Sequence, residues 1–117
     1  MKATMARKFK VINRKELKEK LDRGEKFHLW NVLNKDSFIP SRNIPGSRWV
    51  PLEDLESKVC SLNVGADDEI VVYCSGHKCP ASKSAADKLA SMGYTEVSVY
   101  EGGLEDWSAG GLPYIRF

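Results

Sequence analysis

The chain has 117 residues, of which 42% are hydrophobic and 29% charged, a composition that describes an ordinary soluble globular protein with room for one core. Its formal charge of +2 is too small to favour nucleic acid or a membrane surface as a partner. No apolar run is long enough to cross a bilayer.

The three cysteines do not form the pattern of a secreted disulfide framework. Their number is odd, and the basic N-terminus is not followed by the apolar segment of a secretory signal. We therefore expect reduced thiols and a cytoplasmic location.

The first half of the chain predicts short strands, a capped helix and a long loop. Residues 9–12 predict a strand, and Asn13 followed by Glu16 has the pattern of a capping box that starts a helix ending at Gly24. The apolar residues 27–33 predict a strand covered on both faces. The elements expected next are a loop over 34–47, a brief strand over 48–50 and a short helix opened by Pro51, with Cys60 nearby in the core.

The second half predicts two longer strands, each followed by a helix. Residues 69–73 are β-branched and apolar, which favours a central strand. A helix over 81–92 carries small inward side chains that let it lie close to a sheet, and residues 96–100 form another strand. The alternation favours an α/β fold with a parallel sheet of about five strands and helices on both faces. We expect one domain over residues 1–117, with residues 1–8 as a loosely ordered arm.

Cys74 follows the predicted central strand and lies shortly before a helix. In an open parallel sheet, ligands bind beyond the carboxyl ends of the strands. Gly76 allows a tight turn there, and backbone amides backed by the positive end of a helix can hold an anion. Such surroundings predict a lowered pKa for the Cys74 thiol, to which Lys78 and a protonated His77 would add. The sequence therefore favours a thiolate nucleophile over the alternative, a buried structural cysteine.

Several segments together resemble the rhodanese-like domain family. Residues 71–76 (Val-Val-Tyr-Cys-Ser-Gly), 99–107 (Val-Tyr-Glu-Gly-Gly-Leu-Glu-Asp-Trp) and 111–113 (Gly-Leu-Pro) look like the carboxyl half of such a domain. Residues 44–47 (Ile-Pro-Gly-Ser) and 50–52 (Val-Pro-Leu) resemble the segment before the family's first sheet-covering helices. The similarity spans nearly the whole chain.

The resemblance implies sulfane-sulfur transfer through a persulfide carried on Cys74. The donor would be a thiosulfate- or polysulfide-like anion and the acceptor a thiol of a small molecule or a protein, with no cofactor, nucleic acid or membrane involved. Arg42 and Ser82 are further candidates, because an arginine can approach an anionic donor and a serine can donate a hydroxyl hydrogen bond. The loop residues expected to bind the donor are Ser75, Gly76, His77, Lys78 and Cys79.

The sequence departs from the family pattern near the site. Family members commonly have an arginine in the loop, whereas no arginine lies between Arg48 and Arg116 here, and Lys78 cannot offer a bidentate fork. The loop is slightly longer than usual, since residues 79–82 intervene before the helix pattern. The other departures are Asn31 and Leu33 in place of an acidic and basic pair, and Asn43 in place of a histidine.

Two loop residues have open alternatives. Cys79 is either a resolving thiol that receives sulfur from a Cys74 persulfide or protects it by oxidation, or a loop residue that packs beneath Pro80. Because spacing does not establish disulfide geometry, the sequence favours packing. His77 is either an acid, base or substrate contact, or a solvated side chain. With no fourth ligand near Cys74, His77 and Cys79, no metal site is expected.

Two other functions compete with sulfur transfer. A longer loop can hold a tetrahedral oxyanion, as in a phosphatase or arsenate reductase, although the missing arginine weighs against it. The domain can instead be a catalytically weak module that binds a partner or senses redox state.

Overall fold

Five parallel strands form one sheet in a computed structural model that describes residues 9–117. The arm predicted for residues 1–8 lies outside the described residues. The strands lie in the order β1-β5-β4-β2-β3, which places β4 at the centre, as the sequence predicts. Their bounds are β1 (Lys10–Ile12), β2 (His28–Asn31), β3 (Arg48–Trp49), β4 (Glu69–Tyr73) and β5 (Glu96–Tyr100).

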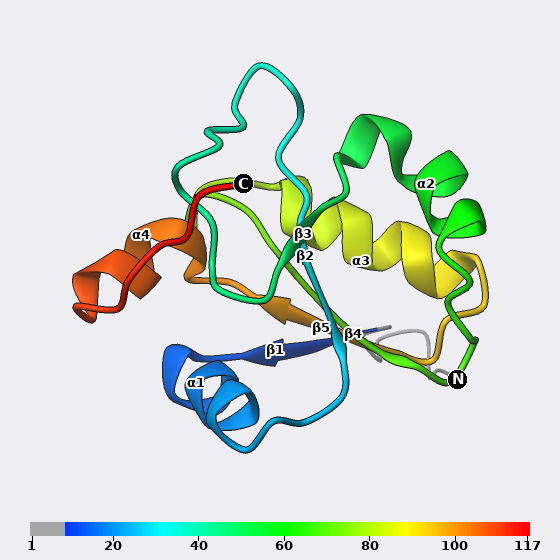
Figure 1. Ribbon diagram of the computed structural model, residues 1–117. Coiled ribbons are helices and arrows are strands. Elements are labelled where there is room, and N and C mark those ends of the chain that lie inside the picture. Colours follow the sequence, from blue (N-terminus) through cyan, green and yellow to red (C-terminus); the bar gives the residue numbers. More distant parts are fainter. Residues whose placement is uncertain (1–8) are drawn as a thin grey trace.

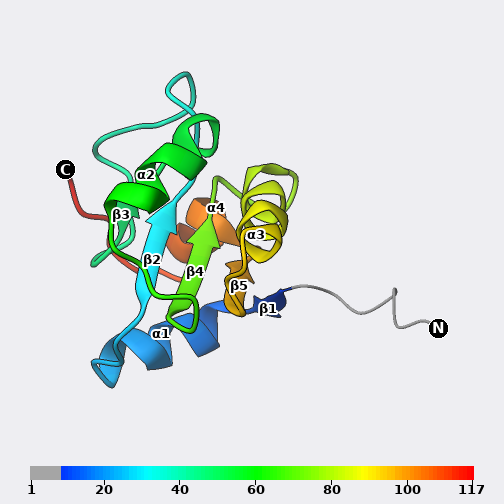
Figure 2. The same ribbon diagram turned by 90° about the vertical axis from the view of Figure 1, so that its right-hand side faces the viewer.

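Helices cover both faces of the sheet, so the predicted α/β architecture is confirmed. Figure 1 shows α1 on one side of the strands, with α2 and α3 on the other. Figure 2 shows β2 and β4 side by side, with α3 next to β4 and β5. The helices are α1 (Arg14–Asp22), the 3-10 turn η1 (Leu52–Asp54), α2 (Leu55–Ser61), α3 (Ala81–Ser91) and α4 (Gly103–Ala109). No helix of residues 9–117 is long and apolar enough to span a membrane.

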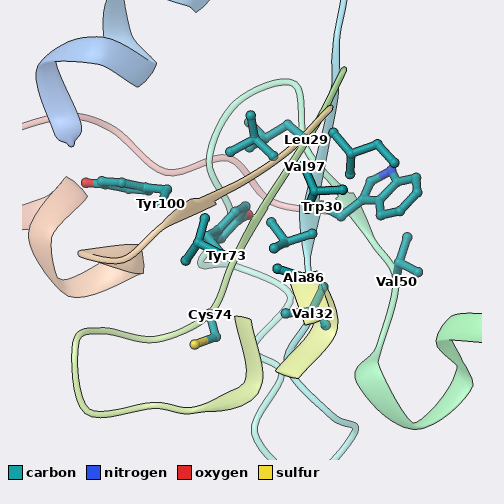
Figure 3. Packing of buried hydrophobic residues seen from close by; sticks show 14 of the residues in the cluster. Leu29, Trp30, Val32, Val50, Tyr73, Cys74, Ala86, Val97 and Tyr100 are labelled. Atoms are coloured by element: carbon teal, nitrogen blue, oxygen red, sulfur yellow. The ribbon is translucent and has the colours of Figure 1, made fainter. Parts of the chain in front are cut away.

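The core lies around β4, because this strand is covered on both faces. Residues 70–73 of β4 have no exposed surface, and they pair with β5 on one side and β2 on the other. On α3, Ala85 and Ala86 are fully buried, and these small side chains let the helix lie close to β4 and β5. Figure 3 shows the resulting packing from β2 across to Ala86. The core therefore holds the carboxyl end of β4 rigidly.

Local signals at the start of α1 act as predicted. Asn13 accepts a hydrogen bond from the Glu16 amide at 2.8 Å, and its own amide donates to the Glu16 carboxylate at 2.9 Å. This capping box satisfies donors that have no partner within the helix. Gly24 follows the helix with a φ of +67°, a backbone conformation that favours glycine.

The β2–β3 connection is fixed to the core through Tyr73. The hydroxyl of Tyr73 accepts a hydrogen bond from the Ile44 amide at 3.1 Å and lies 2.8 Å from the hydroxyl of Ser47. Ile44 is fully buried, so its side chain anchors this loop in the core. Burial raises the pKa of Tyr73 to about 12, so this hydroxyl stays protonated at neutral pH.

The prediction that Cys60 lies in the core is wrong, because its side chain is exposed on α2. Leu55 and Val59 are the buried residues of that short helix, and they lie on one face, four positions apart. The next residue is rotated by about 100° around the helix axis, which turns Cys60 toward solvent.

Candidate functional site

Cys74 is the first residue after β4, and its thiol lies inside the loop that leads to α3. Figure 3 shows the sulfur pointing into the curve of this loop. Cys74 is only 1% exposed. Its Sγ lies 3.5 Å from the hydroxyl of Ser82 and 3.4 Å from the carbonyl oxygen of Cys79. The predicted position at the carboxyl edge of the central strand is correct, but the thiol is enclosed by the loop.

The start of α4 holds the loop in place from behind. The amide of Leu104 donates to the Cys74 carbonyl at 3.0 Å, and the amide of Glu105 donates to the Ser75 carbonyl at 2.8 Å. These bonds use helix-end amides that have no partner within α4. The Gly102–Gly103 turn therefore positions the backbone of the Cys74 loop, a role the sequence analysis did not give it.

Gly76 is buried where the loop crosses α4. A Cβ at this position would lie 2.6 Å from a carboxylate oxygen of Glu105. The Gly76 carbonyl in turn accepts a hydrogen bond from the Cys79 amide at 3.1 Å, which closes a tight turn. Gly76 thus shapes the loop and brings Cys79 back toward Cys74.

The prediction of a lowered pKa for Cys74 is wrong. Burial raises the pKa of this thiol, and the neighbouring Cys79 raises it further. The hydroxyl and backbone amide of Ser82 act in the opposite direction, because they donate hydrogen bonds to a thiolate. The sequence identified the helix terminus but could not show that the loop covers the thiol. At neutral pH, Cys74 is held mainly as a thiol.

Cys79 is the loop cysteine with the lowered pKa. Burial opposes the shift, but hydrogen bonds from the Cys74 thiol and from the backbone amides of Ala81 and Ser75 outweigh it. Cys79 is half-buried, so it is also more accessible than Cys74. The amide of Ala81 at the start of α3 and the amide of Ser75 thus favour an anion at Cys79, whereas the sequence predicted it at Cys74.

His77 and Lys78, which lie between the two cysteines, are exposed, whereas Ser75 is half-buried. The His77 side chain is 68% exposed, and its Nδ1 lies 3.6 Å from the Glu101 carboxylate. The same carboxylate pairs with Lys83 at 2.6 Å, and this contact lowers the pKa of Glu101. Lys78 is exposed. His77 and Lys78 therefore form the outer surface of the loop, while Ser82 reaches the thiol beneath it.

A surface hollow of about 620 Å³ lies beside this loop, between the start of α1 and the end of β5. His77 and Glu101 line it, whereas Cys74 does not. Its wall includes Asp106, which accepts a hydrogen bond from the Tyr100 hydroxyl at 2.6 Å and pairs with Arg14 at 3.1 Å. The hollow thus adjoins the outer side of the loop and does not expose the thiol.

Asn31 and Asn43, two of the positions where the sequence departs from the family pattern, form a pair of buried amides. The Asn31 amide donates to the side-chain oxygen of Asn43 at 3.0 Å, and the Asn43 amide donates to the Pro40 carbonyl at 3.0 Å. Both side chains are fully buried. Arg42 next to them is exposed, and none of its hydrogen bonds or ion pairs within residues 9–117 reaches the Cys74 loop. Within residues 9–117, no three His, Cys, Asp or Glu side chains lie close enough together to hold a metal ion.

Fold and site together define a class: parallel α/β domains in which a cysteine ends the central strand and is enclosed by a loop before a helix. The family model of the rhodanese-like domain matches residues 13–110. The chain belongs to the rhodanese-like domain family.

Solved structures agree with this assignment. A rhodanese-like domain of an Anabaena protein is 30% identical, with a TM-score of 0.73 over 91% of this chain and 78% of its own. The polysulfide-sulfur transferase homodimer of Wolinella succinogenes is 20% identical, with a TM-score of 0.71 over 92% of this chain and 79% of its own. A thiosulfate sulfurtransferase of Pseudomonas aeruginosa is also 20% identical, with a TM-score of 0.72 over 89% of this chain and 19% of its own. No curated protein matches the sequence.

Proposed function

We propose that the protein transfers sulfane sulfur through a persulfide on Cys74. The observation that carries this proposal is the enclosed Cys74 thiol at the end of β4, with the Ser82 hydroxyl 3.5 Å from its sulfur. Family membership supports it, as do the fold neighbours, whose names describe sulfur transfer from polysulfide and thiosulfate. The donor is an anion of that type, and the acceptor is a thiol of a small molecule or a protein.

The first step is attack by Cys74 on the outer sulfur of the donor. The Cys74 thiol loses its proton to water as it attacks. A sulfur–sulfur bond forms on Cys74 while the donor's own sulfur–sulfur bond breaks, and the electron pair leaves with sulfite or a shortened polysulfide. The hydroxyl and amide of Ser82 then stabilise the charge on the bound sulfur.

The second step returns Cys74 to its starting state. A thiolate of the acceptor attacks the outer sulfur of the persulfide, and the electron pair of the broken bond returns to the Cys74 sulfur. Lys78 and His77, both exposed on the loop, attract anionic donors, His77 only when it is protonated. The cycle needs reduced thiols, which fits the cytoplasm.

A non-catalytic binding or redox-sensing module is the second candidate. The burial of Cys74 and the raised pKa of its thiol favour this alternative, since both slow attack on a donor. A phosphatase has less support, because the loop contains no arginine to hold the equatorial oxygens of a phosphoryl group.

Intact-mass measurement after brief exposure to thiosulfate or polysulfide tests the proposal. The wild-type chain is expected to gain one sulfur atom at the earliest time points, and Cys74→Ser should gain none. Cys60→Ser is the matched control, because it removes an exposed thiol remote from the loop and should gain sulfur as the wild type does. Equal uptake by Cys74→Ser, or no uptake by the wild type, would reject sulfur transfer through Cys74 and leave the non-catalytic module.

A further inference from the structure

The loop brings a second thiol to the sulfur of Cys74. The turn closed by the hydrogen bond from the Cys79 amide to the Gly76 carbonyl folds the chain back, and the Cys79 carbonyl oxygen lies 3.4 Å from the Cys74 Sγ. The two thiols also affect each other's ionisation, because Cys79 raises the pKa of Cys74 and Cys74 lowers that of Cys79. The five-residue separation in sequence thus becomes direct contact between the two residues.

Cys79 also has the chemistry of an attacking group. Backbone amides of Ser75 and Ala81 face its sulfur and lower the pKa of the thiol. The side chain is only half-buried, and Pro80 restricts the backbone of the residue before it. A thiolate that is held next to a reacting sulfur gains from proximity as well as from ionisation.

We propose that Cys79 is a second catalytic residue, which resolves the Cys74 persulfide into a Cys74–Cys79 disulfide and releases hydrosulfide. This inference rests on the proposed function. The Cys79 thiolate attacks the inner sulfur of the persulfide, so a bond forms between the two cysteine sulfurs and the bond to the outer sulfur breaks. The outer sulfur takes the electron pair, accepts a proton from water and leaves as hydrosulfide.

The electrons balance within the pair. The sulfurs of Cys79 and Cys74 each give one electron as they become a disulfide, and the outer sulfur takes both as it is reduced from the sulfane state to sulfide. An external dithiol must then reduce the disulfide before another sulfur can be loaded. The protein can thus deliver its sulfur in two ways, to an acceptor thiol when one is present and as hydrosulfide when none is.

The test compares wild type, Cys79→Ser and Cys60→Ser after one loading with thiosulfate or polysulfide and removal of excess donor. Intact mass is followed over time, together with released hydrosulfide and peptide mapping without reduction. In wild type and Cys60→Ser, we expect the added sulfur to disappear, about one equivalent of hydrosulfide to form, and the protein to lose two hydrogen atoms as the Cys74–Cys79 disulfide appears. In Cys79→Ser, the sulfur should stay bound with no disulfide.

The outcomes separate this inference from the proposed function. Sulfur that stays equally long on wild type and on Cys79→Ser would overturn the role of Cys79 while leaving Cys74 as the sulfur carrier. Uptake by neither form would reject the proposed function and the inference together. Loss of sulfur without the Cys74–Cys79 disulfide in the peptide map would also overturn the inference.

Discussion

Gly103 lies directly against the backbone of Cys74, with no space for a side chain between α4 and the end of β4. A Cβ on Gly103 would collide with the Cys74 carbonyl oxygen, and it would lie 2.9 Å from both the Gly76 nitrogen and the Ser75 carbonyl carbon. The φ of Gly103 is +61°, which already favours glycine. The helix after β5 thus fixes the backbone of the loop after β4.

Gly103→Ala should therefore destabilise the protein and disturb the loop. Strain at positive φ together with overpacking predicts a loss of about 2–4 kcal/mol in the free energy of unfolding, measured by denaturant titration. The matched control is Gly111→Ala, since Gly111 has a φ of +75° but nothing within 4 Å of its Cβ position. The control should lose only about 1 kcal/mol from backbone strain. Equal losses in the two variants would show that contact with the Cys74 loop is unimportant.

The two loop thiols should react with an alkylating agent in a defined order. The pKa of Cys79 is lowered and that of Cys74 is raised, so Cys79 ionises at a lower pH than Cys74. Because the thiolate is the form that reacts, Cys79 should be modified first. Modification of Cys74 should become substantial only as the pH rises above the range of an ordinary thiol. Peptide mass mapping after brief exposure to iodoacetamide over a pH series measures the extent of modification of Cys74 and of Cys79. Earlier modification of Cys74 at neutral pH would contradict this assignment.

Removing the Ser82 hydroxyl should make Cys74 less reactive. This hydroxyl lowers the pKa of Cys74, and a hydrogen bond to a charged group contributes about 1.5 kcal/mol or more, so Ser82→Ala should slow sulfur uptake about tenfold at fixed pH. The rate should recover at higher pH, where the thiol ionises without help. Ser84→Ala, at an exposed position of the same helix, is the control and should keep the wild-type rate. A Ser82→Ala rate that is reduced equally at every pH would point to a steric cause.

The buried amide pair should contribute strongly to stability. Asn43→Ala leaves the Asn31 amide and the Pro40 carbonyl without their partner, and an unpaired buried group costs about 1–3 kcal/mol. Thermal or denaturant unfolding should therefore show a loss of about 2 kcal/mol or more. In the wild type, the Glu53 amide donates an exposed hydrogen bond to the side-chain oxygen of Asn34. Asn34→Ala removes this bond and should lower the free energy of unfolding by about 0.5–1 kcal/mol. Similar losses in both variants would mean that the pair is dispensable.

Patterns within a single segment were predictable from the sequence. The capping box of Asn13 and Glu16, the central strand over residues 69–73 and the strand-end position of Cys74 all follow from local periodicity or spacing. The parallel sheet also agrees with the alternation of strands and helices. These features are predictable because they depend on residues that are close together in the sequence.

Features that depend on how a loop folds back on itself, or on contacts between distant segments, were not predictable. Cys74 is covered by its own loop, and Cys79 rather than Cys74 is stabilised as the anion, because the amides of Ala81 and Ser75 face Cys79. The pairing of Asn31 with Asn43 was not predictable for the same reason, although Asn31, a polar residue within an apolar strand, was the available signal. The spacing of residues in the sequence predicts neither the direction in which these side chains point nor their burial.

The most direct test of the account locates the transferred sulfur in Cys79→Ser, where the proposed resolution step cannot occur. The variant is loaded with thiosulfate or polysulfide, free thiols and persulfides are alkylated, and the peptides are analysed by mass. We expect one extra sulfur atom on the peptide that contains Cys74 and none on the peptide that contains the exposed Cys60. Sulfur found on Cys60 to the same extent, or on no peptide at all, would contradict it.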